Sequence, residues 1–82
     1  MEVIVFGTEG CAGCVTVKNL LKQHNIVFTE LDVMNVDHME TAQKYGVRGI
    51  PTVVMPMQNS FGYVTGSDTK SIDLIKDMVG IN

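Results

Sequence analysis

Apolar and polar residues alternate with two different periods along this 82-residue chain, and the changes of period predict its elements. The continuous apolar run 3–6 is typical of a strand covered on both faces, and Gly7 ends it. From about residue 11 or 12 to residue 24 the apolar positions recur at helical spacing, which predicts a helix that stops at Asn25. Residues 27–33 are rich in branched and aromatic side chains and follow a helix-length crossover. We therefore expect a second strand, parallel to the first.

The middle of the chain predicts a short helix and then a hairpin. Asp37 followed by Glu40 resembles a capping box at the start of the short helix, and Gly46 suits its C-terminal cap. Residues 52–55 and 61–65 are β-prone and flank a polar turn, which indicates two antiparallel strands.

A last helix follows a cap at Ser67 or Asp68 and ends at Gly80. Its inward-facing residues share helical spacing: Ile72, Ile75, Met78 and Val79. The complete order is βαβαββα, which predicts an α/β architecture. No internal repeat or linker interrupts it, so residues 1–82 are expected to form one domain.

Composition and charge exclude several classes of protein. Apolar residues make up 45% and charged residues 18% of the chain, which excludes a disordered protein, and no run approaches the roughly 18 apolar residues of a membrane span. A net charge of −3 suits a polyphosphate backbone poorly, so we expect no nucleic-acid partner. The N-terminal run is acidic at Glu2 and too short for a secretory signal, which favours a cytoplasmic protein, expected to be a monomer.

Chemistry concentrates in the pair Cys11 and Cys14, which lies between the end of the first strand and the first turn of a helix. Unpaired N–H groups and the positive end of the helix dipole stabilise an anion there. Lowering a thiol pKa from about 8.5 to about 7 raises its ionised fraction at pH 7 from roughly 3% to about half. Cys11 occupies the exposed end of the helix, whereas Cys14 follows one turn later on the same face. We therefore expect Cys11 to attack a disulfide and Cys14 to resolve the product.

Two structural roles for the cysteines compete with this prediction. A stabilising disulfide across so short a loop contributes only about 2 kcal/mol, and a cytoplasmic thiol pool tends to reduce it. A zinc site needs four ligands, and His24 and His38 lack the close spacing that would complete it. A dimer that shares a metal or an iron–sulfur cluster through these thiols stays open.

Residues 45–53 form the second informative segment. A proline that opens a β-run, such as Pro51, is tolerated at the first residue of a strand and is a weak signal alone. The whole segment resembles the part of thioredoxins that carries their cis-proline, and residues 11–14 stand where that superfamily places its redox-active pair. The front half is similar to small glutaredoxins instead, in its early strand, in residues 8–10 before the motif, and in an A-K-x-L-L-like pattern after it. The resemblance spans essentially the whole chain, and the two motifs together are more specific than either alone.

This resemblance implies a thioredoxin fold, an α/β fold with a four-stranded mixed sheet and three helices on both faces. It also implies that the Ile50–Pro51 bond is cis and that the backbone of Ile50 pairs with an extended substrate peptide. Gly66 matches the family's glycine that lets a substrate backbone approach closely. Apolar contact with the partner would come from Ala12 and Gly13.

The chain also departs from both family motifs, since it lacks the inner residues of W-C-G-P-C and of C-P-Y-C. Glu9 stands where many glutaredoxins have a basic residue nearby, and we expect it to be a solvated loop carboxylate. Asp68 matches the aspartate that holds the amine of glutathione, although a helix cap is its alternative role. Lys18 could favour the thiolate by proximity or simply be solvated, and Arg48 could bind a carboxylate.

The resemblance and the cysteine pair together predict a dithiol–disulfide oxidoreductase that reduces protein disulfides. It would bind no cofactor and would take electrons from NADPH through a thioredoxin-reductase-type flavoenzyme, in preference to glutathione, because Glu9 rather than a basic residue precedes Cys11. Ribonucleotide reductase is a client that the resemblance implies. The alternatives are a glutathione-dependent glutaredoxin and, from another class, a metal or iron–sulfur module.

Overall fold

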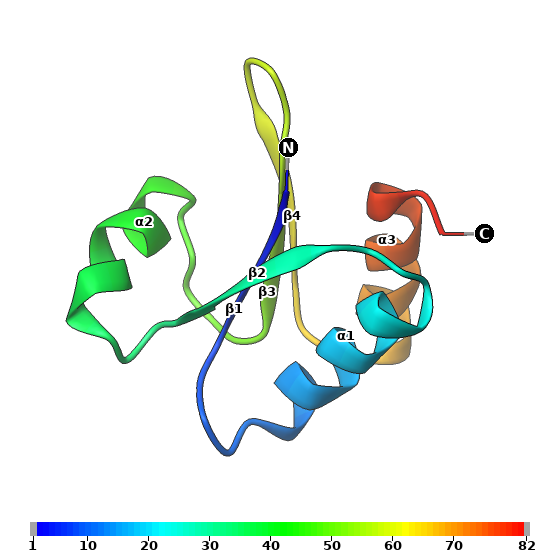
Figure 1. Cartoon of the computed structure of the whole chain (residues 1–82), viewed down its shortest axis with the longest axis horizontal. Helices are drawn as coiled ribbons and strands as arrows, with labels where there is room; N and C mark the ends of the chain where they lie inside the picture. The colour runs from blue at the N-terminus through cyan, green and yellow to red at the C-terminus, as the bar shows by residue number, and fades with distance from the viewer. Residues whose placement is uncertain (1, 82) are drawn as a thin grey trace.

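The computed structural model describes residues 2–81 and shows a four-stranded sheet with helices on both faces (Figure 1). The strands are β1 (Val3–Gly7), β2 (Phe28–Asp32), β3 (Thr52–Pro56) and β4 (Phe61–Thr65). The helices are α1 (Ala12–Gln23), α2 (Met39–Lys44) and α3 (Thr69–Val79), with one 3₁₀ turn, η1 (Val36–His38), before α2. The observed order confirms the predicted βαβαββα arrangement.

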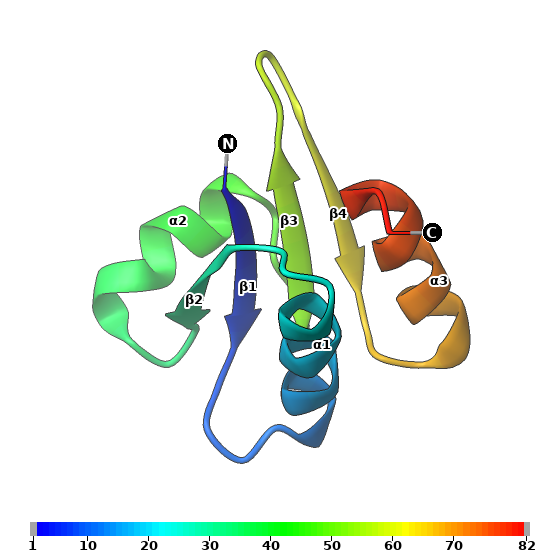
Figure 2. The ribbon, with the colours of Figure 1, turned by 45° about the vertical axis from the view of Figure 1, so that its right-hand side comes forward.

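The sheet order is β2-β1-β3-β4, which makes β1 a central strand as its continuous apolar run predicts. β1 pairs parallel with β2 and antiparallel with β3, and β3 pairs antiparallel with β4. The carboxyl ends of β1, β2 and β4 consequently lie at one end of the sheet, together with the start of β3 (Figure 2). The connections that leave β1 and β4 bring their loops to the same region.

The main core lies between the sheet and the pair α1 and α3, which cover the same face (Figure 1). Its buried members are aliphatic and are at most 5% exposed: Val3, Val5, Val17, Leu21, Val53 and Ile75. Full burial of such a side chain contributes about 1.5–3 kcal/mol each. This core holds α1 against β1 and so anchors the helix that carries the cysteines.

The opposite face of the sheet is covered in part by α2 (Figure 1). Phe6 is fully buried there, and its ring lies 6.3 Å from that of Tyr45. The Tyr45 ring in turn meets Phe61 edge to face at 4.9 Å. α2 has only six residues, and Tyr63 on β4 is 57% exposed.

The helix ends confirm two predicted stops and overturn one predicted cap. The predicted capping box is wrong: the side chain of Asn35 accepts a hydrogen bond from the Asp37 N–H at 2.9 Å and starts η1 instead. Asp37 lies inside this 3₁₀ turn, and α2 starts after His38, whose side chain makes no capping hydrogen bond. The predicted stops at Gly46 and Gly80 are confirmed, with φ of 65° and 83°.

The first helix matches its predicted limits within one residue, and Asn25 after it has a positive φ of 57°. Asp68 is confirmed as the cap of α3. None of the helices in residues 2–81 combines the length and the apolar character needed to cross a membrane.

Candidate active site

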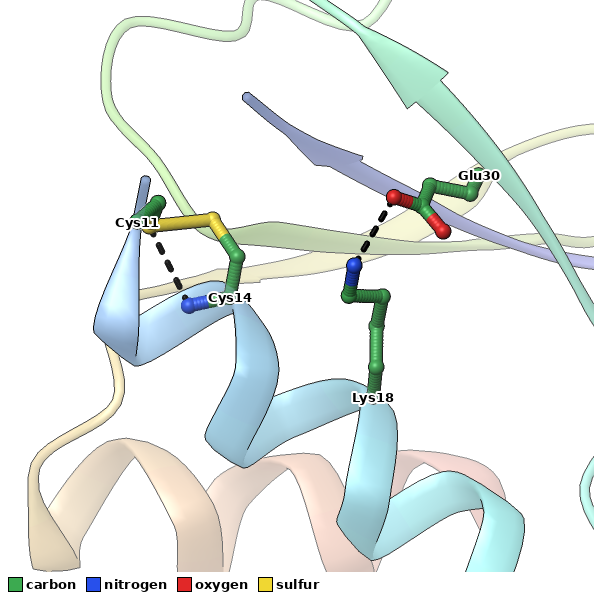
Figure 3. A network of polar contacts seen from close by, with 4 residues as sticks. All are labelled: Cys11, Cys14, Lys18 and Glu30. Carbon is green, nitrogen blue, oxygen red and sulfur yellow. Dashed lines mark hydrogen bonds and ion pairs between the residues drawn. A yellow bond between two sulfur atoms is a disulfide. The ribbon is translucent and has the colours of Figure 1, made fainter. Parts of the chain in front are cut away.

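Cys11 is the N-cap residue of α1, with extended backbone angles of −89° and 106°. Its Sγ accepts a hydrogen bond from the Cys14 N–H at 3.1 Å, and the two residues form a disulfide with their Cα atoms 5.2 Å apart (Figure 3). Cys11 is half-buried, whereas Cys14 is only 2% exposed. The two sulfur atoms therefore differ in access, with Cys11 on the outside.

The start of α1 is electrostatically suited to a thiolate. The first turn of the helix contains no acidic residue, so its dipole and free N–H groups act on Cys11 without a competing charge on the same turn. The hydrogen bond from the Cys14 N–H adds a donor aimed at the sulfur. After reduction, these groups would favour the ionised, nucleophilic form of Cys11.

Gly7, the last residue of β1, makes room for the inner cysteine. A Cβ atom at this position would lie 2.7 Å from Cys14 Sγ, closer than real Cβ atoms approach, and 3.2 Å from Cys14 Cβ. The missing side chain therefore lets the buried sulfur pack on the end of the strand. Sequence reasoning assigned Gly7 only a strand-ending role, and no local signal distinguishes the two.

Three segments far apart in the sequence meet beside the cysteine motif. The Ile50–Pro51 peptide bond is cis, and Pro51 is buried immediately before β3. The Pro51 carbonyl accepts a hydrogen bond from the Gly66 N–H at 2.8 Å. A Cβ added at Gly13 would lie 2.5 Å from Ser67 Oγ and 3.2 Å from Pro51 Cδ. The structure thus brings Pro51, Gly66 and Gly13 together beside Ile50, and Ser67, considered above only as a helix cap, joins them.

Two hydroxyl groups hold the loops in this region. Thr52, which is fully buried, donates to the Gly49 carbonyl at 2.6 Å, and its oxygen lies 2.9 Å from Thr65 Oγ1.

Gly66 has a positive φ of 115°, and a Cβ there would lie 2.7 Å from Ser71 Oγ. A glycine is therefore required at position 66 by the backbone conformation and by the packing of α3, independently of any role in substrate binding.

Lys18 lies on α1 one turn after Cys14 and forms an ion pair with Glu30 of β2, with Nζ and Oε1 2.8 Å apart (Figure 3). The lysine side chain is 22% exposed and the glutamate side chain 56% exposed. Lys18 is therefore neither freely solvated nor an unopposed positive charge beside the thiol. The signal that could have identified Glu30 as the partner of Lys18 is the parallel pairing of β1 and β2, in which Glu30 lies beside Val5.

A cavity of about 560 Å³ opens beside Cys11, between the loop after β1, the first turns of α1 and the end of β2. Its lining residues are Gly7, Thr8, Glu9, Gly10, Cys11, Ala12, Val15, Lys18, Glu30 and Asp32. Glu9 is exposed, which confirms the expected solvated carboxylate. The cavity therefore joins the outer cysteine to three carboxylates and one lysine.

The glutaredoxin family model matches residues 3–58. The chain belongs to the glutaredoxin family. A reductase of N-acetyl-S-hydroxy-L-cysteine from Bacillus subtilis is 29% identical to it over 76 residues, which cover 90% of this chain and 82% of that protein. Among solved structures, a thioredoxin-like protein matches with a TM-score of 0.78 and 25% identity, over 99% of this chain and 97% of that one.

A thioredoxin of Schistosoma mansoni also matches, with a TM-score of 0.74 and 27% identity over 96% of this chain and 73% of that one. These similarities establish the predicted thioredoxin fold. Together with the Cys11–Cys14 pair, they make this glutaredoxin-family protein a thiol–disulfide oxidoreductase. Members of the two families act on disulfide substrates together with a reductase, as the sequence analysis expected.

The remaining predicted site residues lie away from the cavity. Arg48 is exposed and lines a second cavity of about 360 Å³, which it shares with Ile50 and the end of α2. Asp68 caps α3, where Oδ1 accepts from the Ser71 N–H at 2.8 Å. Hydrogen bonds from the Ser71 side chain and backbone lower the pKa of Asp68 below its usual value. In residues 2–81 of this glutaredoxin-family chain, no three His, Cys, Asp or Glu side chains group as metal ligands.

Proposed function

We propose that this protein reduces disulfide bonds of protein substrates by dithiol exchange, with Cys11 as the nucleophile and Cys14 as the resolving cysteine. The observation that carries the proposal is the unequal access of the two sulfur atoms at the start of α1. The Cys11 thiolate attacks one sulfur of the substrate and releases the other as a thiolate. Cys14 then attacks Cys11, which frees the reduced substrate and leaves the Cys11–Cys14 disulfide.

The docking edge for the substrate is proposed at Ile50. This residue is half-buried and precedes the buried Pro51. It makes none of the backbone hydrogen bonds found in the turns, loops and helix caps of residues 2–81. Its N–H and C=O groups are therefore available to an extended peptide, which would bind as one added strand. Gly66 and Gly13 border the same edge without side chains, while Ala12 is exposed and offers apolar contact.

The electron donor is proposed to be a thioredoxin-reductase-type flavoenzyme that uses NADPH. Glutathione carries two carboxylates, and the groups around Cys11 suit them poorly, because Lys18 is already paired with Glu30. Asp68, the candidate for the ammonium group of glutathione, is engaged as a helix cap. We expect the protein to act in the cytoplasm, where a reducing pool maintains dithiols, and ribonucleotide reductase is a candidate client.

The first experiment maps the reactive sulfur and the resolving step. Limiting iodoacetamide at pH 7 should label Cys11 of the reduced protein before Cys14, as peptide mass spectrometry would show. The Cys14→Ser variant should then trap a mixed disulfide with a protein substrate, while a doubly substituted variant without either thiol serves as the control. Preferential labelling of Cys14 would contradict the assignment.

A second experiment identifies the donor. The oxidised protein receives NADPH with either thioredoxin reductase or glutathione plus glutathione reductase, and NADPH consumption is followed with insulin as the substrate. We expect rapid turnover in the first mixture. Turnover in the glutathione mixture alone would favour a glutathione-dependent glutaredoxin and would leave the roles of the two cysteines intact.

A second candidate function is the reduction of a small sulfur compound at Cys11. The cavity beside this residue has room for a small molecule, and the Bacillus subtilis relative is named for reducing one. The same reduced protein can be offered a small disulfide or a small sulfenic acid in place of insulin. Turnover with the small compound and none with insulin would favour this candidate over the first.

A further inference from the structure

The cavity beside Cys11 is open at Gly10. This glycine lines the cavity without a side chain, and a Cβ placed on it would meet nothing within 4 Å. At about 560 Å³ it lies within the range of cavities that hold small molecules. Since Cys11 is also part of the lining, a small disulfide in this cavity would lie next to the attacking residue.

This cavity shares Cys11 and Ala12 with the docking edge proposed for peptides but extends away from the rest of that edge. Its lining includes none of the residues Ile50, Pro51 and Gly66. Cys11 therefore borders two surfaces, one formed by the loop before β3 and the start of α3, the other by the loop after β1 and the end of β2. A small substrate can use the second surface without imitating a peptide backbone.

The charges around the cavity are unequal. The Lys18 ammonium lies 2.8 Å from Glu30 Oε1, so the two opposite charges largely cancel in the cavity. Glu9 and Asp32 remain, both exposed, with Asp32 Oδ1 accepting from the Met34 N–H at 2.8 Å. The lining thus carries two carboxylates that form no ion pair within residues 2–81, and both lie within one Debye length, about 10 Å, of a bound molecule. Such a field attracts a cationic substituent and repels an anionic one.

We propose that this cavity receives low-molecular-weight disulfides whose substituents carry a protonated amine, and that Cys11 reduces them in preference to neutral or anionic disulfides of the same size. This inference rests on the proposed function of the two cysteines. The Cys11 thiolate attacks one sulfur of the disulfide, and the first amine-bearing thiolate leaves and is protonated by water. Cys14 then displaces the second thiolate, so the protein dithiol supplies both electrons and becomes the Cys11–Cys14 disulfide.

The test compares three disulfides of similar length under single-turnover conditions. Prereduced, desalted protein is mixed at pH 7 with cystamine, hydroxyethyl disulfide or dithiodipropionate, and loss of the protein dithiol is followed by alkylation and mass spectrometry. Each rate constant is divided by that of dithiothreitol with the same disulfide, because leaving thiols of lower pKa leave faster. We expect the normalised rate to be about fivefold higher for cystamine than for the neutral disulfide, and lower again for the anionic one. Raising the salt to about 0.5 M should remove most of this difference.

The variant Glu9→Gln combined with Asp32→Asn should bring the cystamine preference close to one. The amide oxygen introduced at position 32 can still accept from the Met34 N–H, so the turn is preserved. The matched control is Asp73→Asn combined with Asp77→Asn, which changes the net charge equally on α3, outside the cavity lining, and should keep the full preference. Equal changes in both double variants would show that net charge, not the cavity, is responsible.

Two outcomes separate the proposals. If insulin and hydroxyethyl disulfide are reduced but cystamine shows no advantage, or an advantage that salt does not alter, the cavity proposal is wrong and the proposed function stands. If neither insulin nor any small disulfide oxidises the protein dithiol, the proposed function fails and the cavity proposal fails with it.

Discussion

A methyl group added at Gly7 would lie 2.7 Å from Cys14 Sγ, whereas one added at Gly10, three residues later, would meet nothing within 4 Å. The same contrast continues into α1. Gly13 is closed in by Ser67 and Pro51, while Ala12 beside it is exposed. The motif thus has a closed side, formed by Gly7, Gly13 and Cys14, and an open side, formed by Gly10, Cys11 and Ala12.

The difference assigns separate tasks to the two sides. On the closed side, packing fixes the position of the inner sulfur, and small residues are needed because larger ones do not fit. On the open side, small residues leave the outer sulfur accessible to a peptide or a small disulfide. A substitution on the closed side should therefore change the stability and the rate at which Cys14 resolves a mixed disulfide. A substitution of equal size on the open side should change the access of substrates to Cys11.

The largest expected effect separates the cysteines themselves. Cys11→Ser should abolish disulfide reduction, because the outer nucleophile is lost while serine still caps α1. Cys14→Ser should attack once and then stall as a mixed disulfide. Insulin turnover measures the first loss, and non-reducing mass spectrometry detects the stalled species. Multiple turnovers by Cys14→Ser at the wild-type rate would mean that the closed side has no part in resolution.

Gly7→Ala tests the packing of the closed side. The added methyl group must displace the Cys14 sulfur, so we expect a destabilisation of about 1–3 kcal/mol. A displacement of this order should also slow resolution of a mixed disulfide by roughly tenfold or more. Urea unfolding gives the first quantity, and the decay of a preformed mixed disulfide gives the second.

Gly10→Ala is the control for this prediction, because it adds the same methyl group on the open side. Its positive φ of 81° makes the substitution cost about 1–2 kcal/mol in backbone strain. Cys14 is untouched, so the mixed disulfide should decay at the wild-type rate. A slow decay in this variant as well would remove the distinction between the two sides.

Gly13→Ala and Ser67→Gly should be coupled. In the wild-type background the alanine pushes against Ser67 Oγ, which offsets the gain of about 1 kcal/mol expected for replacing glycine inside a helix. Once Ser67→Gly removes that contact, Gly13→Ala should become stabilising. Urea unfolding of the four proteins should give a coupling free energy of about 0.5–2 kcal/mol, and additive values would show that the contact does not constrain the motif.

Lys18→Met breaks the ion pair on the open side, where solvent screens charges. With Glu30 more than half exposed, we expect a stability change of at most about 0.5 kcal/mol and insulin reduction within roughly twofold of wild type. Its cystamine preference should rise, since the cavity loses its only lysine. A large stability loss would show that this side is as tightly packed as the other.

The smallest effect is expected at Asp68, which starts the helix next to Ser67. Because the pKa of Asp68 is lowered in the folded protein, its stabilising charge is complete above the unfolded pKa of about 3.9 and is lost as the pH falls through the folded value. Asp68→Asn keeps the cap but removes this titration. The melting temperatures of the two proteins should therefore converge once the pH falls below the folded pKa of Asp68, and a difference that stays constant through this acid range would contradict the assignment.

Local patterns were sufficient to predict the elements and the position of the redox pair. The apolar run of β1, the helical spacing of α1 and the glycines that end α2 and α3 act over a few residues, so each can be recognised in isolation. The wrong capping box shows the limit of this approach. Asn35 and Asp37 are both good local caps, and sequence spacing does not say at which of them the helical backbone begins.

The arrangement around the cysteines depends instead on contacts between distant segments. The match of Gly7 to Cys14, the enclosure of Gly13 by Ser67 and the pairing of Lys18 with Glu30 span between 7 and 54 positions of the chain. The packing of α1 and α3 on one face and the parallel register of β1 and β2 bring these partners together. Side-chain chemistry makes each contact possible, but only the folded backbone sets the distances, because close packing is decided within a few tenths of an ångström.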